Sequence, residues 1–193
     1  MEEAGFVFDG TACFWNQGSD FASIFHVGFG ERHGEWIADP EIGVRCHAIE
    51  AIFHRTSEFS GDQCGTTATI AAPVRLVSRE QPLPIRIASS NDASDAIANI
   101  SHAFNSAALP YFDRNSNLQA MHQLLNSDPT RLCIHMRNDR FRCSKGLIVA
   151  KLVDSSDFDE LLKIYDERMS RAGAVTYNRY FLPLVRDLVN TTN

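Results

Sequence analysis

The sequence predicts an α+β fold in which an antiparallel β meander, formed by the N-terminal half, packs against a helical layer formed by the C-terminal half. Apolar side chains recur two residues apart along Phe21 to Phe29, which is the period of a β-strand. From Ser90 onward they recur three or four residues apart, which is the period of a helix. Pro82 and Pro84 mark a linker between the two patterns.

The β-rich half, 1–88, is expected to begin with a hairpin. Phe6 to Phe8 alternates in the manner of a strand, Asp9-Gly10 favours a tight turn, and residues 11–15 return as the partner strand. After the strand from Phe21 to Gly30, Gly34 and Asp39-Pro40 indicate a polar connection. A further strand is expected over residues 42–55, although Ala48 to Phe53 would also be compatible with a helix. Residues 66–77 are expected to form an edge strand or two short strands, because they contain Pro73.

The helix-rich half, 89–193, completes the expected single domain, 1–193. Asp92 and Asp95 are placed to cap the first helix, and Pro110 is expected to end it. A second helix is predicted to start at Asn115-Ser116 and a third at Ser156. Pro183 is expected to kink or split the last helix. Two apolar runs, 131–136 and 146–153, are too short for their period to assign.

Composition narrows the class of protein. The chain has 193 residues and a formal charge of -6, which argues against nucleic-acid binding and favours a basic protein partner. No apolar run approaches the roughly 20 residues that a membrane span requires, and no secretory signal is recognisable, so we expect a cytoplasmic protein that does not enter a membrane. Five cysteines with irregular spacing are expected to be reduced thiols.

Familiar cofactor motifs are absent. The glycines of Gly28 to Gly34 lack the spacing of a dinucleotide site, and we interpret them as a strand end and a hairpin turn. Gly61 to Thr67 lacks the lysine of a phosphate-binding loop, and we interpret it as a turn followed by a strand. Cys133, His135 and Cys143 could contribute to a zinc site only if a fourth ligand came from elsewhere, such as Cys46 or His47. We therefore expect no cofactor and no metal, and we interpret these thiols as buried.

A basic cluster lies in the same region as these cysteines. Arg137, Arg140 and Arg142 are candidates for binding an anion or an acidic partner. The residues Cys133 to Lys145, together with a histidine from a predicted strand (His26, His47 or His54), therefore define an alternative function, that of a small hydrolase or a phosphate-binding enzyme. No catalytic residue can be assigned from the sequence, because candidate nucleophiles and bases are numerous.

The connection from Glu31 to Glu41 suggests a binding surface. Its four carboxylates surround Trp36, and protein interfaces favour a tryptophan inside a polar rim. The candidate partner-binding residues are Glu31, Glu35, Trp36, Asp39 and Glu41. The alternative is that Trp36 is part of the core and that the carboxylates form an ordinary solvated loop.

The order of these features resembles a bacterial domain-of-unknown-function family, number 4304. The resemblance rests on Gly5-Phe6, Phe14-Trp15, the strand from Phe21 to Phe29, and Ala108 to Asp113 followed by Leu118 to Leu125. It implies an α+β domain without an established activity, of a kind that often accompanies polymorphic toxins as an immunity protein. We therefore expect a non-enzymatic protein that neutralises a bacterial toxin domain by steric and electrostatic occlusion, and a basic toxin domain is the candidate partner.

Overall fold

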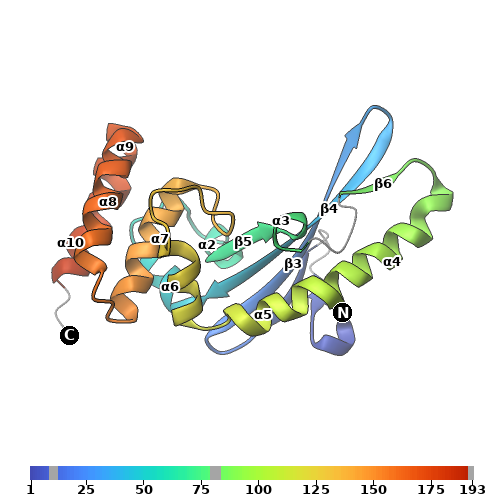
Figure 1. The fold of residues 1–193 in the computed structure, drawn as a ribbon, viewed down its shortest axis with the longest axis horizontal. Helices are drawn as coiled ribbons and strands as arrows, with labels where there is room; N and C mark the ends of the chain where they lie inside the picture. Colours follow the sequence, from blue (N-terminus) through green and yellow to red (C-terminus); the bar gives the residue numbers. More distant parts are fainter. Residues whose placement is uncertain (9–12, 79–83, 191–193) are drawn as a thin grey trace. The chain divides into compact units, whose positions relative to one another are not determined.

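A computed structural model describes residues 1–8, 13–78 and 84–190 and confirms the α+β class (Figure 1). The chain forms two compact units, and each unit is built from two separate segments. The first unit contains Met1–Arg45 and Ala71–Ser116, and the second contains Cys46–Ile70 and Asn117–Asn193. The division between units therefore differs from the division of the sequence into a β-rich and a helix-rich half.

The strands of the described chain form one sheet in the order β1-β2-β3-β4-β5, with β6 also paired to β4. They are β1 (Val7–Phe8), β2 (Cys13–Gln17), β3 (Phe21–Arg32), β4 (Glu35–Cys46), β5 (Ile70–Pro73) and β6 (Ile85–Ile87). β1 and β2 are antiparallel, with Val7 opposite Trp15, so the expected first hairpin is confirmed. Its Asp9-Gly10 turn lies outside the described residues.

Helices cover the sheet within the first unit. The short 3₁₀ helix η2 (Ser90–Asp92) leads into α4 (Ala93–Ala103), the π-helical segment η3 (Phe104–Ala108) and α5 (Leu109–Asn115), which follow one another as a continuous run (Figure 1). The ring of Phe104 packs edge-on against that of Phe25, with the centroids 5.2 Å apart, and Phe6 packs against Phe104 at 5.1 Å. These aromatic contacts join the helices to the sheet.

The expected cap of this helical run is present, but the expected break is not. Asp92 accepts a hydrogen bond from the backbone N–H of Ser89 at 2.8 Å, completing a capping box. The chain nevertheless remains helical through Pro110, so the prediction of a helix end there is wrong. Proline cannot donate to the preceding turn, and the wider π turn of η3 immediately before it accommodates this loss.

The second unit is mainly helical. Its helices are α1 (His47–Phe53), α2 (Gln63–Thr66), α6 (Leu118–Asn126), α7 (Asp139–Leu152), α8 (Phe158–Arg171), α9 (Ala174–Thr176), the π-helical η4 (Tyr177–Phe181) and α10 (Leu182–Asn190). The predicted second helix begins at an Asn117 cap, whose side chain accepts from the N–H of Ala120 at 2.8 Å. At Pro183, as at Pro110, a π-helical segment precedes the proline.

None of the described helices combines the length and apolarity needed to cross a membrane.

Helix α7 is the buried element of the second unit. Every residue from Arg142 to Ala150 is buried, and the helix contacts both α6 and α8. A helix enclosed on all sides has no polar face and therefore no amphipathic period. This explains why the apolar run 146–153 could not be assigned from its sequence.

Two predicted strands are corrected by the structure. The expected strand 42–55 ends at Cys46 and continues as α1, so the prediction of strand for Ala48 to Phe53 is wrong. In the expected strand 66–77, only Ile70–Pro73 is extended, and α3 (Val74–Val77) follows it. In both segments apolar residues suited to strands lie where the chain turns into a short helix, so local composition did not separate the two. The chain begins with a 3₁₀ turn, η1 (Glu2–Ala4).

A substitution at Gly146 tests the close packing of α7. An added Cβ would lie 2.5 Å from Asn126 Oδ1 and 3.0 Å from Tyr165 Cε2. Asn126 cannot easily move, because its side chain donates to the carbonyl of Gly146 at 2.9 Å and accepts from the Tyr165 hydroxyl at 2.8 Å. We expect Gly146→Ala to lower the free energy of unfolding by about 1–3 kcal/mol in urea denaturation.

Gly65→Ala is the matched control for Gly146→Ala. Gly65 also lies in a helix of the second unit, but a Cβ there would have no heavy atom within 4 Å. The control should therefore be neutral or slightly stabilising, as glycine-to-alanine changes in helices usually are. A Gly146→Ala protein as stable as the control would show that α7 is not tightly packed at this position.

Candidate functional site

The predicted polar connection from Glu31 to Glu41 is instead a hairpin. β3 continues to Arg32 and β4 starts at Glu35, which leaves His33 and Gly34 as a two-residue turn. Both turn residues have positive φ, 56° and 82°, as a type I′ turn requires. β6 pairs with β4 along the hairpin, with Trp36 opposite Ile87 (Figure 1).

Trp36 is on the surface of this hairpin. Its exposed fraction is 53%, and that of Phe29 is 54%. A two-residue turn places Arg32 opposite Glu35, so counting back along the strands puts Glu31 opposite Trp36. Phe29, two residues before Glu31 on β3, then lies on the same face as Glu31 and Trp36. We name Phe29, Glu31, Trp36 and Ile87 the hairpin face.

The other candidate carboxylates are on the opposite side of the hairpin. Because side chains alternate along a strand, Glu35, Asp39 and Glu41 point away from the face that carries Trp36. Each of these carboxylates lies beside a basic side chain: Glu35 is 3.7 Å from Arg86, Asp39 is 3.1 Å from Arg75, and Glu41 is 3.9 Å from His26. Of the four predicted carboxylates, the structure therefore brings only Glu31 to the side of Trp36.

The three candidate anion-binding arginines do not form one site. Arg142 is buried, and its guanidinium donates to the backbone carbonyls of Leu125, Asp128 and Arg131, where it ties the end of α6 to α7. Arg140 pairs with Glu58 at 3.7 Å and is half-buried, whereas Arg137 is exposed.

The candidate zinc ligands are buried or partly buried thiols and an imidazole. All five cysteines are free, and burial raises the pKa of Cys143 to about 12, which keeps it a neutral thiol. Burial also lowers the pKa of His135. Within the described ranges, no group of three His, Cys, Asp or Glu side chains is arranged to hold a metal ion.

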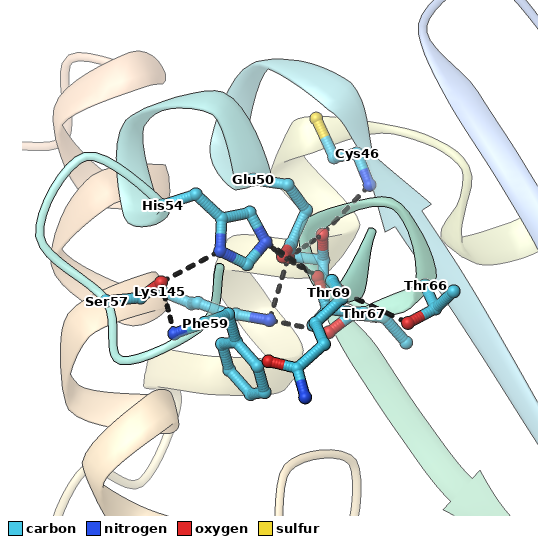
Figure 2. A network of polar contacts seen from close by, with 11 residues as sticks. Cys46, Glu50, His54, Ser57, Phe59, Thr66, Thr67, Thr69 and Lys145 are labelled. Atoms are coloured by element: carbon cyan, nitrogen blue, oxygen red, sulfur yellow. Dashed lines mark hydrogen bonds and ion pairs between the residues drawn. The ribbon is translucent and has the colours of Figure 1, made fainter. Parts of the chain in front are cut away.

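Two charged side chains buried in the second unit belong to a polar network that was not predicted from the sequence (Figure 2). Glu50 on α1 is fully buried, and Lys145 on α7 is 2% exposed. Lys145 Nζ lies 2.8 Å from Glu50 Oε1, donates to the carbonyl of Ala68 at 2.6 Å, and lies 4.6 Å from the ring centre of Phe53. The pair connects α1, α7 and the segment before β5.

Two threonines of that segment complete the surroundings of the Glu50 carboxylate. Thr69 donates to Oε1 at 2.8 Å, and Thr67 donates to Oε2 at 2.6 Å. The hydroxyl of Thr69 also accepts from the backbone N–H of Cys46 at 2.9 Å, at the start of α1. Both carboxylate oxygens are therefore hydrogen-bonded inside the protein, as a buried charge requires.

His54 extends the network toward the surface (Figure 2). Its Nε2 lies 2.8 Å from Thr67 Oγ1 and 3.2 Å from Glu50 Oε2. Because Thr67 uses its own proton on Glu50, Nε2 must be the donor to Thr67. A neutral His54 then carries its lone pair on Nδ1, which lies 2.9 Å from Ser57 Oγ. Ser57 Oγ accepts from the N–H of Phe59 at 3.3 Å, which leaves the hydroxyl proton for Nδ1.

These contacts keep Glu50 ionised. Burial alone would raise the pKa of the Glu50 carboxyl, but the hydrogen bond from His54, the positive charge of Lys145 and the hydrogen bond from Thr67 outweigh burial and lower the pKa to about 2. The network therefore contains a carboxylate beside an ammonium group at neutral pH, and His54 lies between that carboxylate and a hydroxyl group.

A small cavity of the second unit reaches Ser57. It is lined by Phe53, Thr56, Ser57, Glu58, Arg140, Phe141, Ser144, Met169, Thr176 and Tyr180. Its volume of 20 Å³ admits about one water molecule. Ser57 is thus the hydroxyl at the outer end of the network, and Arg140, one of the predicted anion-binding residues, lines the same cavity.

The members of the network are too far apart in the sequence to be recognised as a site. Glu50, Thr67 and Lys145 come from three separate segments, and His54 was expected in a strand rather than at the end of a helix. One signal was present. Glu50 is a single charge inside an apolar segment, and Lys145 directly precedes the apolar run 146–153; charges in such places are seldom buried without a partner.

No protein-family model, curated protein or solved structure matches this chain. The resemblance to family 4304 therefore rests on the residues quoted for it, and the proposals below are argued from the geometry of the chain itself.

The low pKa of Glu50 predicts how stability depends on pH. A carboxyl whose pKa falls from 4.5 to about 2 on folding stabilises the protein above pH 4.5 and loses that contribution as the pH falls toward 2. We expect the stability difference between wild type and Glu50→Gln to shrink by about 3 kcal/mol over this range. Urea unfolding at a series of pH values measures it.

Glu160→Gln is the control for this titration. Glu160 is an exposed carboxylate on α8, in the same unit as Glu50. Its substitution should leave the pH dependence of unfolding close to that of wild type. If Glu50→Gln and Glu160→Gln gave the same pH dependence, Glu50 would not be the ionised centre of a buried network.

Proposed function

We propose that the protein is a binding protein of the immunity type, which neutralises a basic toxin domain non-enzymatically, by occluding it with the β3–β4 hairpin. The observation that carries this proposal is that Trp36 is 53% exposed. It lies near the start of β4, and most of that strand from Ala38 to Cys46 is buried. A large exposed aromatic side chain is costly in water and typical of the centre of an interface.

The two faces of the hairpin suit a partner with a cleft. The hairpin face offers Phe29 and Trp36 as apolar anchors, with Glu31 beside them. The opposite side carries Glu35, Asp39 and Glu41, each already near a basic group. An inserted hairpin would thus bury its apolar face and leave its ion pairs at the rim, where they require little desolvation.

Charge supports a basic partner. The chain carries a formal charge of -6, and a field of this sign attracts a basic domain and speeds its association. Basic clefts are common in proteins that act on nucleic acids, so a nuclease domain is the toxin class that we favour.

The alternative, an enzyme built from Cys133 to Lys145, is supported in one respect. Lys145 from that region does meet a histidine, His54, at the Glu50 carboxylate. The thiol of Cys143, by contrast, is buried and neutral, so it is not an activated nucleophile.

The test begins with the genes beside the gene for this protein: we expect one of them to encode a toxin domain, and neighbours of any other kind would contradict the immunity function. Wild type should bind that domain and block its activity, and Trp36→Ala should weaken binding about 30-fold or more, as expected for the loss of an interfacial tryptophan. Calorimetry measures the affinity, and circular dichroism verifies that the variant is folded.

Ile97→Ala is the matched control for Trp36→Ala. Ile97 is an exposed apolar residue of the same unit, 64% exposed on α4, and lies outside the hairpin face. It should bind as wild type does. Equal affinity of wild type and Trp36→Ala would remove the hairpin from the interface, and failure of the wild type to bind the neighbouring product would contradict the immunity function.

A further inference from the structure

The second unit contains a hydrogen-bonded series that the binding function does not use. Ser57 Oγ lies 2.9 Å from His54 Nδ1, and His54 Nε2 lies 3.2 Å from Glu50 Oε2. Figure 2 shows Ser57, His54 and Glu50 in this order, with the ammonium group of Lys145 also at the carboxylate of Glu50. We propose that Ser57 is the nucleophile of an acyl-transfer site, with His54 as its general base and Glu50 as the carboxylate that orients His54.

The protonation pattern is the one that a serine nucleophile requires. Thr67 donates its only proton to Glu50, so the Nε2–H of His54 points to Thr67 and Glu50, and the Nδ1 lone pair faces Ser57. The carboxylate then stabilises the imidazolium that forms when His54 removes the serine proton. In the usual triad Nε2 faces the serine and Nδ1 faces the carboxylate, whereas here Nδ1 faces Ser57 and Nε2 faces Glu50. A triad is recognised by its geometry and not by the order of its residues in the sequence.

Glu50, His54 and Ser57 differ in how deeply they are buried, and the difference matches their proposed roles. Glu50 is fully buried and the side chain of His54 is 10% exposed, whereas Ser57 is half-buried and lines the surface cavity. A base and its orienting group that are protected from water, next to a hydroxyl that a ligand can reach, form an arrangement suited to nucleophilic catalysis.

The cavity indicates the substrate class. Its volume of 20 Å³ restricts the group that can enter beside Ser57 to a small one, and Phe53, Phe141 and Met169 make its lining largely apolar. Arg140 also lines the cavity, where its guanidinium is paired with Glu58 at 3.7 Å and donates to Thr176 Oγ1 at 3.3 Å. The site therefore fits the smallest acyl esters, such as an acetyl ester whose methyl group enters the cavity and whose alcohol portion remains outside.

The reaction proceeds in two steps. Ser57 Oγ bonds to the ester carbonyl carbon as its proton passes to His54 Nδ1, and the bond from carbon to the alcohol oxygen then breaks while His54 returns that proton to the leaving alcohol. Water next attacks the acyl-serine, with His54 taking a proton from the water and returning it to Ser57. The products are a carboxylic acid and an alcohol, and no oxidant or metal is consumed.

The test uses p-nitrophenyl acetate with the full-length protein. We expect acetylation of Ser57, found by acid quenching, proteolysis and mass spectrometry, together with release of p-nitrophenolate. Within the same wild-type peptides, Ser60 provides an internal control, because it is an exposed serine three residues away. Acetylation of Ser57 should exceed that of Ser60 by about 100-fold or more, the usual contribution of a positioned base.

Variants separate the acyl-transfer site from general surface reactivity. His54→Gln and Ser57→Ala should each abolish the fast acetylation, and Ile97→Ala, at an exposed position on α4, should leave it unchanged. The proposal is overturned if Ser57 of the wild type is not acetylated, if it reacts no faster than Ser60, or if folded His54→Gln reacts as fast as wild type. The comparison of Ser57 with Ser60 in the wild type is decisive even if a variant does not fold.

Discussion

The second unit depends on one buried ion pair, Glu50 with Lys145. Neither group is exposed by more than 2%, and removing a charge of this size from water costs several kcal/mol. The cost is offset because the carboxylate also accepts from Thr67 and Thr69 and the ammonium group also donates to Ala68. Removing either partner would leave the other charge buried and uncompensated, so the pair constrains α1, α7 and the segment before β5 to one arrangement.

The same pair determines what His54 can do. Lys145 and the threonines fix the position of the Glu50 carboxylate, and the imidazole four residues later approaches it through Nε2. The other ring nitrogen then faces Ser57. The network thus connects a structural ion pair in the interior with a hydroxyl at a surface cavity. The hairpin face of the first unit offers a different chemistry, that of apolar side chains suited to a protein partner.

The sequence predicted elements that have one buried and one solvated face. The strand that begins at Phe21, the cap at Asp92 and the helix that follows Asn115-Ser116 were all recognised from such patterns and are confirmed. Helix α7 was missed because its residues from Arg142 to Ala150 are buried on all sides. The helix end predicted at Pro110 was wrong because the π turn of η3 accommodates the proline. A strand end and hairpin turn were expected within Gly28 to Gly34, but the strand that starts at Glu35 was expected to be a polar connection. The alternation that separates Glu35 from Trp36 was therefore not predicted. The Glu50 network joins three distant segments, which no local pattern encodes.

The protonation state of His54 is the most direct test of this account. Nitrogen-15 NMR at mildly alkaline pH, with the resonances assigned by comparison with His54→Gln, distinguishes the two neutral forms of the imidazole. The hydrogen bonds of Thr67 predict that Nε2 carries the proton and Nδ1 carries the lone pair. A proton found on Nδ1 instead would contradict both the network around Glu50 and the activation of Ser57.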